Sequence, residues 1–178
     1  MKTLIIHPED YSTEFLSQIY APIVNKTVIT EEVSKSEIRK LIDSHDRVLM
    51  LGHGSPNGLL SIDMFPDAGS YIIDDSMVLS LKNKTNCLFI WCNSDQFVQR
   101  HGLSGLCTGM FISEIAEADY YGFDNIDVDL IDQSNERFVS VLSKYINEPM
   151  EVLYQNLQHE YGLLVRTNPI ARFNLERL

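Results

Sequence analysis

Short apolar runs recur along the first half of the chain, and a polar or amphipathic stretch follows each of them. Uninterrupted runs stand at residues 4–6, 48–51 and 88–91, with a weaker one at 28–29. A run in which consecutive residues are apolar is typical of a strand covered on both faces, as in a parallel sheet. We therefore predict a buried strand at each of these positions.

Helical patterns separate and follow these runs. Ser34, with Glu37 three residues later, forms a capping box ahead of an amphipathic helix. In the C-terminal third, apolar residues at 138–145 recur at helical intervals, and Pro149 precedes a second periodic stretch that Gly162 is expected to end. The alternation of strand and helix predicts the α/β class: a three-layer α/β/α sandwich around a mostly parallel central sheet of about five or six strands.

Two segments between the runs are less regular. Residues 55–71 contain four glycines and prolines, and we predict a loop or hairpin over one end of the sheet. The glycine-containing stretch 102–105 is interpreted as a turn. The apolar residues 110–112 that follow it form either a fifth central strand or the start of a helix running to Ala118.

The length and net charge of the chain exclude some classes of function. A chain of 178 residues with 44% apolar and 22% charged residues is expected to form one domain over residues 1–178. The formal net charge of −11 argues against a nucleic-acid surface, because phosphate binding needs clustered Lys and Arg. An acidic body is compatible with basic peptide substrates or partners.

Cysteine content and hydropathy indicate the compartment. Three cysteines, an odd number, do not suggest a disulfide framework. The apolar run at 4–6 is too short for a secretory signal, and no stretch approaches the ~18 apolar residues of a membrane span. We expect a reduced, cytoplasmic protein with no membrane or nucleic-acid partner, and the sequence leaves its oligomeric state open.

Reactive side chains follow two of the strongest predicted strands. Leu51-Gly52 leads into His53-Gly54, and Ile90-Trp91 leads into Cys92. In open parallel sheets, ligands bind beyond the carboxyl ends of the strands. If the two strands are parallel neighbours, an imidazole and a thiol emerge at the same edge of the sheet.

These residue types suit nucleophilic catalysis. A cysteine thiol acts as a nucleophile when a base or cation favours its thiolate and substrate can reach it. His53 meets the first requirement. The backbone N–H groups of Gly54 and Cys92 are candidate donors for the oxyanion of an acyl-transfer intermediate. No cofactor is expected for such chemistry.

The two segments together resemble the caspase-hemoglobinase cysteine peptidases, a group that includes caspases, legumains, gingipains, clostripain, separases and CHAT proteases. The resemblance covers about Leu4 to Ile112, and its core is the stretches 48–54 and 88–94. It implies a caspase-like fold and a cysteine endopeptidase acting on peptide or protein substrates. It also implies Cys92 as nucleophile, His53 as base or acid, and the Gly54 and Cys92 amides as the oxyanion hole.

The chain departs from caspases in detail. Caspases have Gln-Ala before the nucleophile and a glycine two residues after it, whereas Cys92 stands in Ile-Trp-Cys-Asn-Ser. No cleavage linker is evident, so we expect a single-chain protein. These departures leave the specificity open.

Specificity in this group comes from the residue before the scissile bond. Residues 119–132 contain five aspartates, and related enzymes build part of the specificity pocket in this region. We predict that Asp127 and Asp129 contribute to a pocket for Arg or Lys. The alternative is a solvated acidic loop with no such role.

Three other interpretations stay open. His53, Cys92, His101 and Cys107 have side chains that bind zinc, but no closely spaced ligand pair occurs, and we predict no metal site. The chain is alternatively a non-catalytic caspase-like binding or regulatory module, in which Cys92 resists alkylation. A flavodoxin-like small-molecule binder is the third interpretation, and it gives Cys92 no role.

Overall fold

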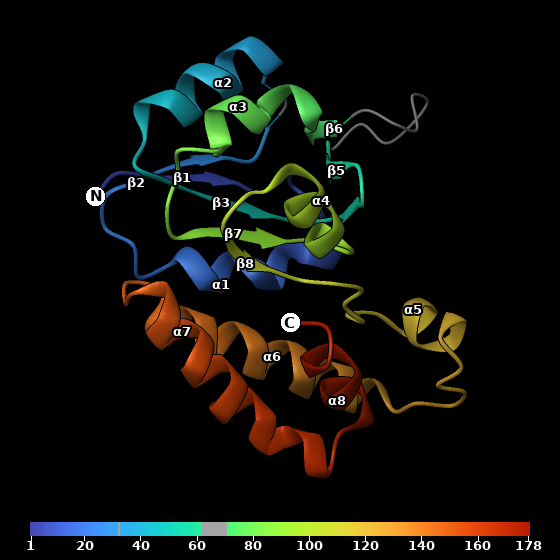
Figure 1. Cartoon of the computed structure of the whole chain (residues 1–178). Helices are drawn as coiled ribbons and strands as arrows, with labels where there is room; N and C mark the ends of the chain where they lie inside the picture. Colours follow the sequence, from blue (N-terminus) through green and yellow to red (C-terminus); the bar gives the residue numbers. More distant parts are fainter. Residues whose placement is uncertain (32, 62–70) are drawn as a thin grey trace.

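A five-stranded sheet in which every strand pair is parallel forms the centre of the fold (Figure 1). The computed structural model describes residues 1–31, 33–61 and 71–178. In spatial order the strands are β2 (Lys26–Ile29), β1 (Thr3–Ile6), β3 (Arg47–Leu51), β7 (Cys87–Ile90) and β8 (Gly105–Cys107). Strands β1, β2, β3 and β7 therefore lie where the apolar runs predict them.

Burial on both faces explains why the central strands are uninterrupted apolar runs. Every residue of β1, β3 and β7 is buried. Consecutive side chains of a strand point to opposite faces. Accordingly, Ile5 and Leu49 belong to the hydrophobic cluster on one side of the sheet, and Leu4 and Val48 belong to the cluster on the other side.

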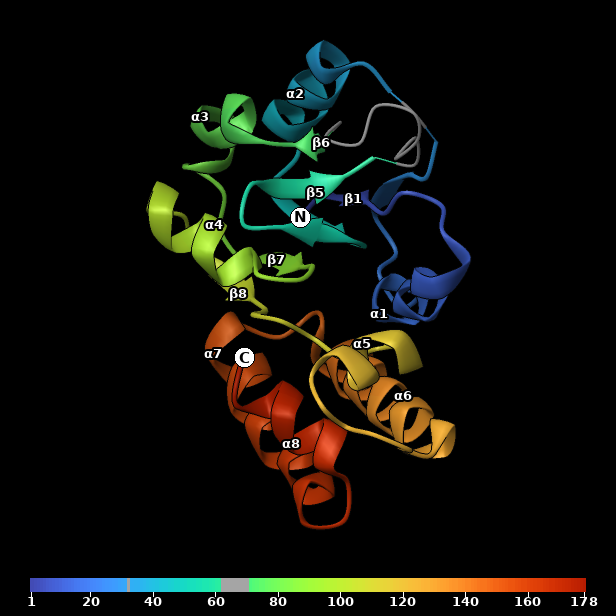
Figure 2. The ribbon, with the colours of Figure 1, turned by 90° about the vertical axis from the view of Figure 1, so that its right-hand side faces the viewer.

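Helices cover both faces of this sheet, as Figure 1 and the rotated view in Figure 2 show. One layer contains α2 (Lys35–Ser44), η2 (Asp75–Met77), α3 (Val78–Leu81) and α4 (Ser94–His101). The opposite layer contains η1 (Tyr11–Leu16), α1 (Ser17–Tyr20), α6 (Val128–Tyr145) and α7 (Met150–Asn156). The predicted α/β class with a parallel sheet between two helical layers is confirmed.

The C-terminal third adds further helical segments to the layer of α6. They are α5 (Ile115–Tyr120), the π-helical turn η3 (Leu157–Tyr161), η4 (Leu163–Arg166) and α8 (Pro169–Leu175). Gly162 does not end the helix that follows Pro149, contrary to the prediction. It has right-handed helical angles, φ −59° and ψ −24°, and joins η3 to η4. None of the helices that the structure describes is both long and apolar enough to cross a bilayer.

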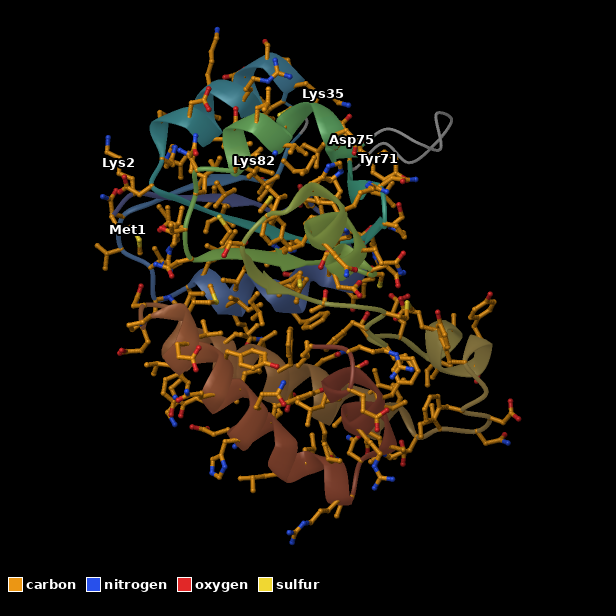
Figure 3. The ribbon with its side chains drawn as sticks, in the orientation of Figure 1. Met1, Lys2, Lys35, Tyr71, Asp75 and Lys82 are labelled. Atoms are coloured by element: carbon orange, nitrogen blue, oxygen red, sulfur yellow. The ribbon has the colours of Figure 1, made fainter. Side chains whose placement is uncertain are left out.

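Polar side chains define the ends of several helices. The Ser34 hydroxyl accepts a hydrogen bond from the Glu37 N–H at 3.3 Å, which confirms the predicted start of α2. Asp74 caps η2 and pairs with Lys35 at the start of α2, which links two neighbouring helices of this layer. Figure 3 labels Lys35 at the start of α2 and Asp75, the first residue of η2.

A second, antiparallel sheet lies at the end of the central sheet that faces the viewer in Figure 2. It contains β4 (Gly54–Ser55), β5 (Gly58–Leu60) and β6 (Tyr71–Ile73). The predicted hairpin within 55–71 is therefore present up to Leu60, and residues 62–70 lie outside the described part of the chain. Trp91 is 2% exposed, and its indole Nε1 donates a hydrogen bond to the Ser55 carbonyl at 3.0 Å. This bond attaches the small sheet to the end of β7.

The fifth central strand is not where the apolar pattern places it. Residues 110–112 form neither a strand nor part of a helix, and the edge strand is Gly105–Cys107. Gly105 has a φ of +157°, and a side chain there would overlap the Cys87 carbonyl of the adjacent strand. The stretch 102–105, interpreted as a turn, thus contains the C-cap of α4 at Gly102 and the first residue of β8. The close approach of the Cys87 carbonyl requires glycine at position 105. A short strand that begins with this glycine forms no apolar run, so the pattern of apolar residues did not predict it.

Gly54 gives a direct test of how closely the small sheet packs on the central one. A Cβ at Gly54 would overlap the Trp91 indole and the Gly58 carbonyl oxygen. We expect Gly54→Ala to lower the free energy of unfolding by about 1–3 kcal/mol, as overpacking of a close-packed region does. Gly162→Ala is the control, because its Cβ meets only Leu175 at 3.5 Å and its backbone is helical. Denaturant unfolding of both variants checks this, and equal stabilities would contradict it.

Candidate active site

The pairing of β3 with β7 places His53 and Cys92 at one edge of the central sheet. Leu51 pairs with Ile90, and the Gly52 N–H continues the ladder by donating to the Ile90 carbonyl at 3.0 Å. His53 and Cys92 then line the same small cavity, with a volume of about 30 Å³. A space of this size holds about one or two water molecules. The cavity is a narrow space at the strand ends rather than an open cleft.

His53 is held on its outer side by a segment that follows β1. Its Nε2 lies 2.6 Å from the Ser12 hydroxyl and 3.9 Å from an Asp10 carboxylate oxygen. The Ser12 hydroxyl donates its single hydrogen to that same Asp10 oxygen at 2.6 Å. Since the Ser12 oxygen can then only accept, Nε2 of His53 must carry the hydrogen of this contact. In the neutral ring, Nδ1 is therefore the basic nitrogen.

Asp10 is fixed by its place at the start of η1. It is the N-cap of this helical turn, and its carboxylate accepts from the Ser12 N–H at 2.8 Å. The hydrogen bond from the Ser12 hydroxyl, and after it the one from the Ser12 N–H, keeps the pKa of Asp10 below its ordinary value. Asp10 therefore stays a carboxylate near neutral pH.

The sequence reasoning did not find Asp10 or Ser12. An Asp-x-Ser segment after a strand indicates a helix cap, and this is the only local sign of their presence. Their contact with His53 joins residues 41 positions apart, so it depends on the pairing of β1 with β3.

The surroundings of the Cys92 thiol favour its neutral form. It lies 3.7 Å from the Phe111 carbonyl oxygen and 4.0 Å from a Glu117 carboxylate oxygen. Burial, together with the nearby charge of Glu117, raises the pKa of the Cys92 thiol to about 11. Among the residues that the structure describes, no hydrogen bond joins this thiol to His53, although both groups line one cavity.

Of the two residues whose amides are predicted to hold an oxyanion, Cys92 lines the cavity, whereas Gly54 is not among its lining residues. Gly54 faces Leu59 in the ladder, and the adjacent ladder bond runs from the Leu60 N–H to the His53 carbonyl at 2.9 Å. In that antiparallel arrangement the N–H of Gly54 itself points away from β5. Cys92 lies just before the left-handed residue Asn93 (φ 64°), which precedes the first turn of α4. The positive end of a helix favours a negative sulfur or oxygen at this place.

The other candidate residues lie elsewhere. Asp127 is the N-cap of α6 and accepts from the Asp129 N–H at 3.1 Å; both residues are exposed, and neither lines the cavity of His53 and Cys92. His101 pairs with Asp75 at 2.9 Å. Within residues 1–31, 33–61 and 71–178, no group of three or more His, Cys, Asp or Glu side chains is arranged to hold a metal ion.

Comparisons of the chain with protein-family models, with curated proteins and with solved structures found no match. The similarity to caspase-hemoglobinase peptidases therefore stays a prediction, based on the residues around His53 and Cys92 and on the arrangement of the strands that carry them.

Glu117 provides a test of the environment of the Cys92 thiol. In the native protein, we expect the rate of alkylation of Cys92 by iodoacetamide to keep rising up to a pH of about 11, because only the thiolate reacts. Glu117→Gln removes a negative charge and keeps an acceptor for the Ser113 N–H, so it should move this rise to lower pH.

Mass spectrometry of peptides labelled over a pH series measures this rate for each cysteine, at pH values where circular dichroism shows a native fold. Glu148→Gln, on an exposed residue far along the chain, is the charge-matched control. A rise for wild-type Cys92 that is complete near neutral pH would contradict a buried, neutral thiol.

Proposed function

We propose that this protein is a cysteine endopeptidase with a caspase-like arrangement, in which Cys92 is the nucleophile and His53 transfers the proton. The observation that carries the proposal is the shared cavity of the two side chains at the ends of adjacent parallel strands. The Ser12 contact supports it further, because it occupies Nε2 of His53 and leaves Nδ1 as the basic nitrogen.

The reaction proceeds through an acyl-enzyme. His53 Nδ1 takes the thiol proton as the Cys92 sulfur attacks the peptide carbonyl carbon, and a C–S bond forms. The imidazolium then gives that proton to the leaving nitrogen, the C–N bond breaks, and a thioester remains. Water, deprotonated by His53, attacks the thioester, which releases the carboxylic acid and restores the thiol.

Two features of the site suit the charges of this reaction. The N–H groups of Gly54 and Cys92 are candidates to donate to the carbonyl oxygen as it becomes negative. The Asp10 carboxylate, 3.9 Å from His53 Nε2, stabilises the imidazolium that forms in the first step. The raised pKa of the Cys92 thiol keeps the thiolate scarce before substrate binds. The proposal therefore has the thiol proton pass to His53 while the sulfur attacks the carbonyl carbon.

Peptide cleavage by wild type, Cys92→Ala and His53→Ala tests the proposed function. We expect the wild type to cleave a mixed peptide library and both variants to lose at least about 100-fold in rate, since each lacks one half of the dyad. Cys107→Ala, which removes a partly buried thiol outside the cavity, is the matched control and should retain activity.

A peptidyl electrophile gives a second readout. It should label Cys92 in the wild type and label it much more slowly in His53→Ala. Cleavage that persists unchanged in Cys92→Ala would overturn the proposal.

Ser12 is expected to act as a positioning residue for His53. Ser12→Ala removes the acceptor for His53 Nε2–H, so we expect kcat to fall about 10-fold or more with little change in KM. Ser12→Thr keeps a hydroxyl and should restore most of the rate. Steady-state kinetics of both variants check this, and equal losses in Ser12→Ala and Ser12→Thr would show that the hydroxyl does not matter.

One observation favours a second function, that of a non-catalytic binding module. The Cys92 thiol is half-buried and its pKa is raised to about 11, and the cavity beside it is small. These are properties of an inert cysteine. If Cys92 resists the peptidyl electrophile in the native protein while Cys107 reacts with it, the binding module is the better description.

A further inference from the structure

One wall of the Cys92 cavity comes from the chain between β8 and α5, which runs between the central sheet and α8 in both ribbon views (Figures 1 and 2). Its residues that line the cavity are Thr108, Phe111 and Ser113. The other lining residues lie in η1 or at the ends of β3 and β7. We refer to residues 109–112 as the covering segment.

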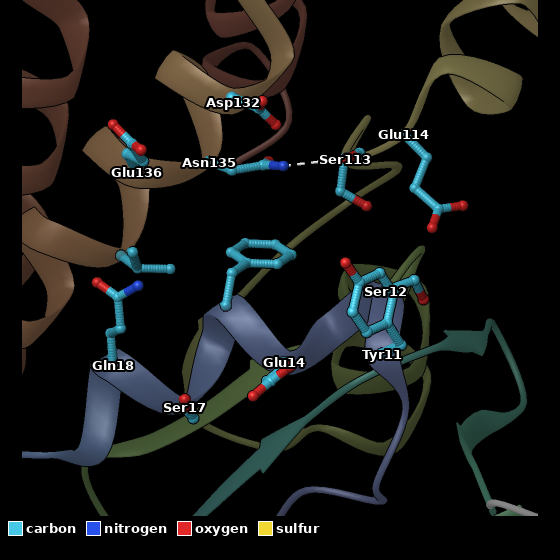
Figure 4. Close-up of a pocket in the computed structure, with 12 residues that line it drawn as sticks. Tyr11, Ser12, Glu14, Ser17, Gln18, Ser113, Glu114, Asp132, Asn135 and Glu136 are labelled. Carbon is cyan, nitrogen blue, oxygen red and sulfur yellow. Dashed lines mark hydrogen bonds between the residues drawn. The ribbon is translucent and has the colours of Figure 1, made fainter. Parts of the chain in front are cut away.

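The two residues that flank the covering segment are fixed to the body of the protein. The Thr108 hydroxyl donates to the carbonyl of Trp91, the residue before Cys92, at 2.8 Å. At the other end, the Ser113 carbonyl accepts a hydrogen bond from Asn135 Nδ2 at 3.0 Å (Figure 4). The covering segment is therefore a short strap between two fixed points, and the contacts of its middle decide how closely it lies over the thiol.

Asn174 of α8 holds the middle of the covering segment. This side chain is 0% exposed; its Oδ1 accepts from the Ile112 N–H at 2.7 Å, and its Nδ2 donates to the Ile112 carbonyl at 2.9 Å. Nδ2 also donates to the Ser134 hydroxyl at 3.3 Å, and the Tyr161 hydroxyl lies 2.7 Å from that hydroxyl oxygen. The Asn174 amide is thus fixed from behind and binds both backbone groups of one residue of the strap.

The bond to Asn174 also fixes the carbonyl that contacts the Cys92 thiol. The N–H of Ile112 and the C=O of Phe111 belong to one planar trans peptide unit, so they point in opposite directions. One side of this unit meets Asn174, and the other side meets the Cys92 sulfur at 3.7 Å. A thiol has a single hydrogen, and a hydrogen donated to Phe111 is not available to His53.

A second hydrogen bond fastens the start of the covering segment. The Gly109 N–H donates to the Arg177 carbonyl at 2.7 Å, and the Gly109 carbonyl accepts from the N–H of Asn93, the residue after Cys92, at 3.0 Å. Arg177 is itself held against α8, because its guanidinium carbon lies 3.5 Å from the centre of the Phe173 ring and its Nη1 donates to the Phe173 carbonyl at 2.7 Å. Both fastenings therefore come from α8 and the residues directly after it.

We infer that α8 is an autoinhibitory latch: Asn174 and Arg177 keep the covering segment closed over Cys92, and a peptide reaches the thiol only after these bonds break. This inference rests on the proposed function and adds its regulation. The closed cavity, of about 30 Å³, has room for about one or two water molecules and none for a peptide backbone. Movement of the covering segment opens it and leaves the pairing of β3 with β7, which places His53 and Cys92, unchanged.

Two variants weaken the latch from opposite sides. Asn174→Ala removes both hydrogen bonds to Ile112. Gly109→Ala leaves α8 intact, but its Cβ would lie 3.1 Å from the Arg177 Cβ and 3.3 Å from the Arg177 carbonyl oxygen, so Arg177 must shift away. If Asn174→Ala does not fold, Gly109→Ala carries the test.

Each variant has a matched control. Asn168→Ala removes another buried asparagine of the same helical segment, which caps α8 through the Ala171 N–H and bonds to the Leu130 carbonyl rather than to the covering segment. Gly162→Ala adds a Cβ that meets α8 only at Leu175, at 3.5 Å, an ordinary van der Waals contact. Both controls are expected to behave as wild type at Cys92.

The first measurement is the rate at which iodoacetamide alkylates each cysteine of the native protein, followed by mass spectrometry of peptides. We expect the rate at Cys92 to rise at least about 10-fold in Asn174→Ala and about 3-fold in Gly109→Ala, because local opening needs fewer bonds to break. Cys87, which is 0% exposed within β7, reports global unfolding and should react as slowly as in the wild type. A rise that Cys87 or Asn168→Ala shares shows general loosening and overturns the latch.

The second measurement is kcat/KM for a mixed peptide library. We expect both latch variants to exceed the wild type about 3-fold or more, because a larger fraction of the protein is open to substrate. A merely structural asparagine predicts the opposite, a loss of activity. Cleavage by the wild type that neither variant accelerates overturns the latch and leaves the peptidase proposal standing.

The two measurements also separate this inference from the proposed function. Faster alkylation of Cys92 alone, with no peptide cleaved by any variant, supports the latch as the control of access to the thiol and overturns the peptidase. Alkylation of Cys92 at the wild-type rate in both latch variants overturns the latch whether or not peptides are cleaved.

Discussion

The parallel pairing of β3 with β7 is the constraint on which the proposed site depends. Two apolar strands that must be covered on both faces lie at the centre of the sheet, and their common direction brings their carboxyl ends to one edge. The chain places His53 and Cys92 just beyond those ends, so register alone sets them in one cavity. A slip of one residue in this pairing would turn one of the two side chains away from the other.

Charge is distributed unevenly around this edge. The Cys92 thiol, half-buried beside Glu117, has a raised pKa, and the Asp10 carboxylate lies 3.9 Å from Nε2 of His53. The larger cavity beside this site, which Phe15 and Ser113 also line, adds four more carboxylates: Glu14, Glu114, Asp132 and Glu136.

The sequence by itself determined the class of fold and the pair of reactive residues. Uninterrupted apolar runs predicted the positions of β1, β3 and β7, because strands buried on both faces leave no polar alternation. The Ser34 cap fixed the start of α2 for an equally local reason. His53 and Cys92 were found because they directly follow such strands. Where a strand begins with glycine, as β8 does at Gly105, or a helix continues through Gly162, local pattern gave the wrong boundary.

Only the tertiary structure decided what surrounds the pair. Ser12 reaches His53 across 41 residues, and Glu117 approaches Cys92 from the other end of the site. The larger cavity beside the site, lined by Glu14, Glu114, Asp132 and Glu136, draws these carboxylates from the segment after β1, from the residue before α5 and from α6, so no spacing in the chain marks them as a set. The burial of Cys92, and with it the pKa of its thiol, also depends on which distant segments cover the side chain. Such properties arise from contacts between distant parts of the chain, and a linear pattern contains no record of them.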